Sequence, residues 1–265
     1  MYCKHFGLTR LPFTKELAVE DLFPSTSAKE LEVRLNHLIE MRGIGLVTGE
    51  VGSGKTTSTR RVVSALHTGR YRVAYVQLTT GNVTDLFKSI AWEMGLSTER
   101  SRAALHYRIK TEVARLCQES RLRPVLIVDE AQHLRPDVIE DLRLLTNYAM
   151  DSENRLCLIL VGQAELRRRL SMSVHEALNQ RIVMRFHVGG LTREELPGYL
   201  AHQLKLAGTE LPVFEPSAVE ALFSACSGLP RKVNLLAHHA LLAAALAKSR
   251  TVSADHVQAA LPEVA

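Results

Sequence analysis

The chain has 265 residues, of which 46% are hydrophobic and 23% charged, and its formal net charge is +5. This hydrophobic fraction excludes an intrinsically disordered chain, and the length allows one large domain or a core with a small additional domain. The mild positive charge favours an anionic partner such as nucleic acid, but an ordinary basic surface explains it equally well.

Cysteine spacing and hydropathy indicate the cellular compartment in which the protein is expected. Four cysteines lie far apart, and no CxxC or Cys/His metal-ligand spacing occurs. This pattern predicts reduced, structural thiols in a cytoplasmic protein. The first residues lack the apolar run of a signal peptide, and the apolar stretch 240–247 is too short to cross a bilayer. We therefore expect a soluble protein without a membrane anchor.

Short apolar runs alternate with helical patterns over the first 190 residues. Strands are expected at 44–49, 73–78, 124–130 and 156–162, with a weaker fifth at 184–190. Helices are expected between them at 55–68, 84–94, 103–120, 136–150 and 163–180. This alternation predicts an α/β fold with a parallel sheet.

The pattern changes after Gly190, where only helical segments follow. They lie at 191–208, 215–228, 229–248 and 252–264. We therefore expect an α/β core over residues 1–190 and a small all-helical lid over residues 191–265.

A glycine-rich loop follows the first expected strand. Its sequence, GEVGSGKT from Gly49 to Thr56, fits the pattern G-x-x-x-x-G-K-[ST] without a mismatch. Glycines let such a loop curl so that its N–H groups surround phosphate oxygens, and the next helix adds its positive end. Lys55 is expected at the β- and γ-phosphates of ATP and Thr56 on Mg²⁺. The expected nucleotide-binding residues are Gly49, Val51, Gly52, Ser53, Gly54, Lys55, Thr56, Thr57 and Asp129.

An acidic pair follows the third expected strand, in the run VLIVDE. Asp129 is placed to orient Mg²⁺ together with Thr56, and Glu130 to polarise the water that attacks the γ-phosphate. A helix cap is the alternative interpretation of such a pair. Together the glycine-rich loop and the acidic pair predict an ATPase that uses Mg²⁺.

The order of these motifs resembles a known family. The loop, then VLIVDEAQHL, LILVGQAELRRRL, LNQRI and SGLPRKVN, resembles the AAA+ ATPases of the ExeA-like group, which also includes transposon regulators of the TniB/TnsC type. The segment from Phe6 to Ile39 is similar to the N-terminal signature of that group. The resemblance extends from about Phe6 to Leu261 and implies a P-loop NTPase core with a C-terminal helical lid.

The resemblance also implies catalytic roles for residues outside the two motifs. Gln163 matches the polar sensor that positions the attacking water, although it could instead cap the next helix. Arg231 matches a second sensor at the start of a lid helix, and Gly228 and Pro230 are expected to set the turn before it.

A further arginine is expected to act on a neighbouring subunit. Arg181 resembles the arginine finger that completes the adjacent active site, and Arg185 is the competing candidate. An arginine suits this role because its planar, permanent cation can stabilise charge on phosphoryl oxygens. This role implies a homo-oligomer, either a ring or a helical filament.

Two biological functions remain open at this stage. The resemblance fits a regulator of DNA transposition that oligomerises on duplex DNA and recruits or activates a transposase, and it also fits a secretion-system accessory ATPase. Secretion ATPases of this group continue through a membrane helix into a cell-wall-binding region, and neither is found in this sequence. On that basis we favour the transposition regulator; a stand-alone signalling ATPase is a third alternative.

Two groups of binding residues are expected with less specificity. Non-specific, salt-sensitive DNA contacts are expected from Thr79, Thr80, Asn82, Arg100 and Arg102. The basic run ELRRRL at 165–170 fits a subunit interface as well as DNA. The adenine could be contacted by Leu11, Pro12, Phe13, Leu22 or Phe23. These residues could equally belong to the hydrophobic core.

Overall fold

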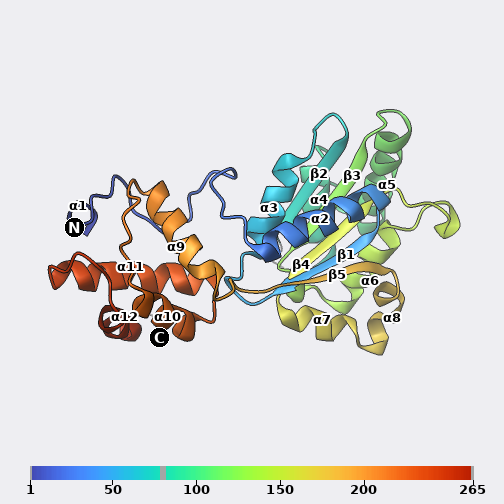
Figure 1. Ribbon diagram of the computed structural model, residues 1–265. Helices are drawn as coiled ribbons and strands as arrows, with labels where there is room; N and C mark the ends of the chain where they lie inside the picture. Colours follow the sequence, from blue (N-terminus) through green and yellow to red (C-terminus); the bar gives the residue numbers. More distant parts are fainter. Residues whose placement is uncertain (1, 78–81, 264–265) are drawn as a thin grey trace. The chain divides into compact units, whose positions relative to one another are not determined.

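The computed structural model describes residues 2–77 and 82–263, which form two compact units (Figure 1). The sheet unit comprises Glu30–Glu50 and Lys55–Val188. The helical unit comprises the described residues up to Lys29, the loop Val51–Gly54, and the chain from Gly189 onward. The expected division at residue 190 did not anticipate that the N-terminal segment groups with the C-terminal helices.

The sheet unit contains five parallel strands in the order β2-β3-β4-β1-β5. They are β1 Ile44–Gly49, β2 Tyr71–Gln77, β3 Arg123–Asp129, β4 Cys157–Gly162 and β5 Ile182–Val188. This arrangement confirms the predicted parallel sheet. Because parallel strands end at the same edge of a sheet, the segments that follow β1, β3 and β4 emerge together there.

Helices cover both faces of the sheet, which explains why its inner strands read as continuous apolar runs. On β3, Val125 and Ile127 pack in one cluster with α2 (Thr26–Met41) and α3 (Lys55–Ala65). Leu126 and Val128 point to the other face, which is covered mainly by four further helices of the unit. These are α4 Val83–Glu93, α5 Arg102–Gln118, α6 Pro136–Leu145 and α7 Ala164–Leu170. Figure 1 shows α2 crossing in front of the strands.

Three helical segments differ from the sequence expectation. Helix α2 was left unassigned by the sequence pattern. The pattern at 136–150 ends at Leu145, and a 3₁₀ turn at Ala149–Asp151 follows, with φ of 48°, 53° and 73° at its three residues. The pattern at 163–180 divides into α7, a 3₁₀ turn at Ser173–His175 and α8 at Glu176–Asn179.

The helical unit has its own hydrophobic core. It contains α1 Tyr2–His5, α9 Glu195–Leu206, α10 Pro216–Cys226, α11 Pro230–Leu246, α12 Ala254–Ala260 and a 3₁₀ turn at Leu261–Glu263. The last four helices correspond to the four that the sequence predicts after Gly190, and α10 and α11 each start with proline in the first turn, where its missing N–H costs nothing.

The N-terminal segment contributes aromatic residues to this core. Phe13 packs edge-to-face on Phe214, and Phe23 packs edge-to-face on Tyr199. The hydroxyl of Tyr2 lies 2.9 Å from Nδ1 of His238. Of the two roles considered for Phe13 and Phe23, the structure shows the core role.

Two further properties concern the thiols and the membrane. All four cysteines are free, and burial raises the pKa of the Cys157 thiol to about 12 and that of Cys226 to about 11. Within residues 2–77 and 82–263, the helices lack the combination of length and apolar character needed to cross a bilayer.

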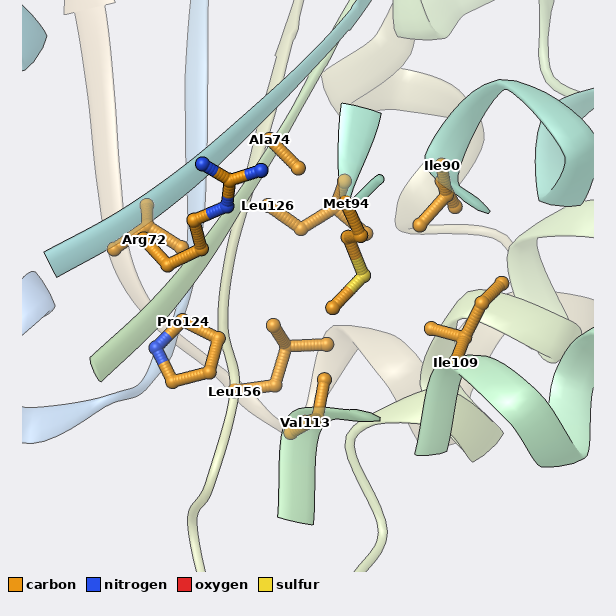
Figure 2. A pocket seen from close by; sticks show the side chains of 10 residues that line it. Arg72, Ala74, Ile90, Met94, Ile109, Val113, Pro124, Leu126 and Leu156 are labelled. Atoms are coloured by element: carbon orange, nitrogen blue, oxygen red, sulfur yellow. The ribbon is translucent and has the colours of Figure 1, made fainter. Parts of the chain in front are cut away.

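A cavity lies inside the sheet unit between the strands β2 and β3 and the helices α4 and α5 (Figure 2). Nine of its ten lining residues are apolar, and Arg72 is the exception. Its residues come from the core and not from the loops after β1, β3 and β4, so the cavity is a packing feature and not a candidate for phosphate chemistry.

Candidate nucleotide-binding site

The loop between β1 and α3 requires glycine at two positions. Gly52 and Gly54 have φ of +83° and +94°, values that residues with a Cβ rarely adopt. A Cβ at Gly54 would meet no atom within 4 Å, so the backbone conformation alone calls for glycine there. At Gly52 a Cβ would also lie 2.6 Å from Cβ of Arg231. The loop therefore has the curled backbone that the sequence motif predicts.

The side chains of the loop suit a phosphate. Lys55 is 9% exposed, and its Nζ donates to the carbonyl oxygens of Gly49 at 3.0 Å and Glu50 at 2.8 Å. The Oγ atom of Ser53 is buried and has no hydrogen-bond partner among the described residues. An ammonium and a buried hydroxyl beside the N-terminus of α3 can both donate to phosphate oxygens, so the loop fits the group that its sequence implies.

Asp129 joins the loop to the end of β3. Its carboxylate is 2% exposed and accepts three hydrogen bonds. Oδ2 accepts from Oγ1 of Thr56 at 2.7 Å and from the hydroxyl of Tyr75 at 2.8 Å, and Oδ1 accepts from the N–H of Glu130 at 2.8 Å. A hydroxyl and a carboxylate are oxygen ligands of the kind Mg²⁺ prefers, so Thr56 and Asp129 fit a magnesium site.

Tyr75 on β2 was not predicted as a site residue from the sequence. Burial, followed by the hydrogen bond to Asp129, raises the pKa of the Tyr75 hydroxyl well above its ordinary value of about 10. The phenol therefore stays protonated and serves as a permanent donor to Asp129. Its only sequence signal is its position near the end of a strand that neighbours β3.

Glu130 lies directly after β3 with its backbone in the left-handed region, at φ 55° and ψ 34°. It makes no side-chain cap hydrogen bond to the turn that follows, so the structure does not show the alternative role of a helix cap. Its Oε2 instead accepts a 2.6 Å hydrogen bond from Nε2 of Gln132.

Gln132 is the second residue that the sequence analysis missed. It is 7% exposed, and its Oε1 accepts a 3.1 Å hydrogen bond from the backbone N–H of Gln163. Gln163 precedes α7, and its side chain does not cap that helix. Gln132 therefore connects the segment after β3 with the segment after β4.

Arg169 lies in the basic run that the sequence analysis left open between DNA and a subunit interface. Its guanidinium donates to the carbonyl oxygen of Gln132 and, at 2.6 Å, to that of Leu134. Arg169 thus has an intramolecular role, whereas Arg167 and Arg168 are exposed.

Both finger candidates contact their own chain in the sheet unit. Arg181 forms an ion pair with Asp151, and its Nη1 lies 3.4 Å from Oγ1 of Thr146. Arg185 donates to the carbonyl oxygen of Ile182 at 2.9 Å and to Oδ1 of Asn179 at 3.0 Å. Their roles toward a neighbouring subunit stay predictions.

Arg231 lies in the first turn of α11, after Pro230 at the first helical position. Its backbone N–H donates a 3.3 Å hydrogen bond to the carbonyl oxygen of Gly52, which belongs to the same unit. The turn before α11 uses Gly228 at φ +70°, where a Cβ would lie 2.0 Å from the carbonyl oxygen of Leu191. The sensor candidate therefore lies beside the tip of the loop.

Two of the five residues expected to contact DNA have structural roles within the chain. Thr79 and Thr80 lie outside the described residues. Asn82 caps α4 by accepting a 3.0 Å hydrogen bond from the N–H of Thr84. Arg102 forms an ion pair with the buried carboxylate of Asp141, and Arg100 is exposed. Asn82 and Arg102 therefore have structural tasks that the sequence did not reveal.

A comparison with protein-family models finds a match for the part of the chain that contains this site. Residues 39–170, which include the loop, both acidic residues and Gln163, match the family model described as AAA domain. The fold is that of the P-loop AAA ATPases. Among the solved structures that share it, Cdc6p from Pyrobaculum aerophilum has a TM-score of 0.71 at 18% identity, covering 95% of this chain and 70% of that one. The ORC2 protein of Aeropyrum pernix, solved as ADPNP–ADP complexes, has a TM-score of 0.69 at 20% identity, covering 96% and 71%.

A curated relative of this chain is more similar in sequence than these solved structures. The chain is 34% identical over 266 residues to General secretion pathway protein A of Aeromonas hydrophila. The match covers 100% of this chain and 48% of the relative, so the chain spans about half the length of that protein. The comparison supports the ExeA-like part of the resemblance and does not show the TniB/TnsC part.

Proposed function

We propose that this AAA domain protein is an ATPase that binds ATP with Mg²⁺ in the loop from Gly49 to Thr57. One observation carries the proposal: Asp129 accepts the Thr56 hydroxyl, and the next residue, Glu130, is a carboxylate held by Gln132. A phosphate-binding loop, an oxygen-rich magnesium site and a candidate base thereby meet at one edge of the sheet.

Each residue has a task that follows from its chemistry. When bound, Mg²⁺ would neutralise charge on the phosphates. Lys55 would exchange the carbonyl oxygens of its own loop for phosphate oxygens, and Thr56 and Asp129 would hold the metal. Glu130 would accept a proton from the attacking water.

The remaining residues complete the proposal. Gln163 would orient the attacking water, and Arg231 would respond to the γ-phosphate. Arg181 would act on the site of an adjacent subunit, which makes the protein active as a homo-oligomer. Support for these roles comes from the sequence resemblance and, for Arg231, from its position beside Gly52.

For the biological role, we propose an accessory ATPase of protein secretion. The similarity of the whole chain to General secretion pathway protein A supports this choice. The transposition regulator, which the sequence analysis favoured, has no support from these comparisons, and two of its five DNA-contact candidates hold their own chain together. We therefore rank the secretion function above the transposition function, opposite to the preference drawn from the sequence.

Two variants test the ATPase. Lys55→Ala is expected to abolish binding of a fluorescent ATP analogue, and Glu130→Gln to retain binding while hydrolysis falls by about 10²–10⁴-fold. Lys205→Ala, on the exposed end of α9, is the matched control for the loss of a lysine. Tight nucleotide binding by Lys55→Ala would contradict the site assignment, and hydrolysis at the parental rate by Glu130→Gln would remove Glu130 as the base.

A chimera tests the biological role. This chain would replace the corresponding half of General secretion pathway protein A in an Aeromonas hydrophila strain that lacks that protein. Recovery of protein export into the medium, lost again with Lys55→Ala, is the expected result. Failure of an expressed chimera to restore export, together with salt-sensitive co-sedimentation on duplex DNA, would return the transposition function to first place.

A further inference from the structure

Gln132 makes one hydrogen bond to each of two segments that the proposed reaction needs. Its amide nitrogen donates to Oε2 of Glu130 at 2.6 Å, and its amide oxygen accepts from the backbone N–H of Gln163 at 3.1 Å. A glutamine side chain can do both because it carries a donor and an acceptor on one planar group. Neither a glutamate nor a leucine of similar size offers this pair.

The surroundings of Gln132 hold its side chain in one place. The residue is 7% exposed, and a Cβ at Gly162 would lie 2.8 Å from its Oε1 atom. Glycine at position 162 thus leaves room for the amide beside the end of β4. The backbone of the same turn is held by Arg169, which donates to the carbonyl oxygens of Gln132 and Leu134.

We propose that Gln132 is a positioning residue that orients the carboxylate of Glu130 and couples its position to the segment at Gln163. This inference rests on the proposed ATPase function. Glu130 has no side-chain cap bond to its own turn, so the Gln132 amide is what directs one of its oxygens. A displacement of the segment before α7 is transmitted through Gln132 to Glu130.

The variant Gln132→Glu separates the two bonds. The introduced carboxylate keeps an acceptor for the N–H of Gln163 and nearly the same volume. It loses the donor to Glu130 and places a like charge beside it, which displaces the Glu130 carboxylate by repulsion. Gln132→Ala removes both bonds, and Gln118→Glu on the exposed end of α5 controls for the added charge.

The first readout needs no nucleotide. Hydrogen exchange of the Gln163 backbone amide is expected to accelerate at least tenfold in Gln132→Ala and to stay within about threefold of the parent in Gln132→Glu. Unchanged exchange in Gln132→Ala would show that the link to Gln163 does not hold in solution. If Gln132→Ala fails to fold, Gln132→Glu, which keeps the volume and the acceptor, carries the kinetic part of the test.

The second readout is steady-state ATP hydrolysis. Gln132→Glu is expected to lower kcat at least tenfold with KM changed less than threefold. In the Glu130→Gln background the same change should have no further effect, because Gln132 acts through Glu130. Parental kcat in Gln132→Glu, or a full additional loss in the double variant, overturns the inference.

The two proposals fail in different ways. A parent protein that binds but never hydrolyses ATP would defeat the proposed ATPase while the exchange measurement still tests the link between Gln132 and Gln163. An active parent whose Gln132 variants match it defeats only the positioning role.

Discussion

Thr56 and Asp129 lie 73 residues apart in the sequence, and the hydroxyl of Thr56 donates a 2.7 Å hydrogen bond to Oδ2 of Asp129. One residue is at the start of α3 and the other at the end of β3, so the parallel sheet brings them together. The contact joins the two motifs that were recognised separately in the sequence.

Replacing the Thr56 hydroxyl tests the magnesium site. Thr56→Val keeps the shape and removes the oxygen, so we expect the Mg²⁺ concentration for half-maximal ATP hydrolysis to rise about tenfold or more, with Thr56→Ser close to the parent. Thr59→Val is the matched control, because it removes a buried hydroxyl from the same helix. Among the described residues this hydroxyl donates to the carbonyl oxygen of Lys55. Equal magnesium curves for Thr56→Val and Thr59→Val would exclude Thr56 as a ligand.

Mixing two inactive variants tests the arginine finger. Arg181→Ala retains an intact loop, and Lys55→Ala retains an intact finger, so a mixture can assemble sites that have both. We expect each variant alone to lose about tenfold or more of its activity and the mixture to regain a substantial fraction. Recovery with Arg185→Ala in place of Arg181→Ala would transfer the role to Arg185. No recovery with either, in mixtures that co-assemble, would argue against a shared site.

The Arg102–Asp141 pair predicts a stability effect. The Asp141 side chain is 6% exposed, and removal of Arg102 leaves that carboxylate without its cation. We expect Arg102→Ala to lower the free energy of unfolding in urea by about 1–3 kcal/mol, and Arg100→Ala to change it by less than about 0.5 kcal/mol. If the two variants were equally stable and both weakened co-sedimentation with duplex DNA, Arg102 would be a DNA contact after all.

His106 predicts a dependence of stability on pH. Its pKa is lowered by burial, followed by the charge of Lys110; Asp141 opposes this effect and Arg102 adds to it. The unfolded chain binds a proton near pH 6.5, whereas folded His106 does so only at lower pH. Stability is therefore fully present above pH 6.5 and declines as the pH falls through that value toward the folded pKa.

Urea denaturation between pH 8 and pH 5.5 measures the His106 effect. His106→Gln cannot take up the proton, so its free energy of unfolding is expected to decline less steeply than that of the parent over this range. Parallel curves for the parent and His106→Gln would show that His106 does not contribute to the slope.

The sheet and the phosphate loop could be predicted because their signals are local. Burial on both faces leaves continuous apolar runs in β1, β3 and β4, and the loop residues are adjacent in the chain. Asp129 and Glu130 could be predicted for the same reason, since they lie at the end of a buried strand and directly after it.

The parts that were missed depend on contacts between distant segments. Tyr75 reaches Asp129 because β2 pairs with β3, and Gln132 reaches Gln163 because β3 pairs with β4. The ion pair of Arg102 joins α5 to α6. Neither residue type nor spacing signals such contacts, and the grouping of the N-terminal segment with the C-terminal helices is equally invisible in a linear pattern.

At Glu130 the left-handed backbone favours glycine, whereas the proposed role as catalytic base requires a carboxylate. Glycine would adopt φ 55° without the roughly 1 kcal/mol penalty that a side chain brings, so a chain optimised for thermal endurance alone would carry glycine there. The residue best suited to the backbone would thus remove the proposed catalytic base, so a design that raises stability by replacing residues of positive φ with glycine should leave Glu130 unchanged.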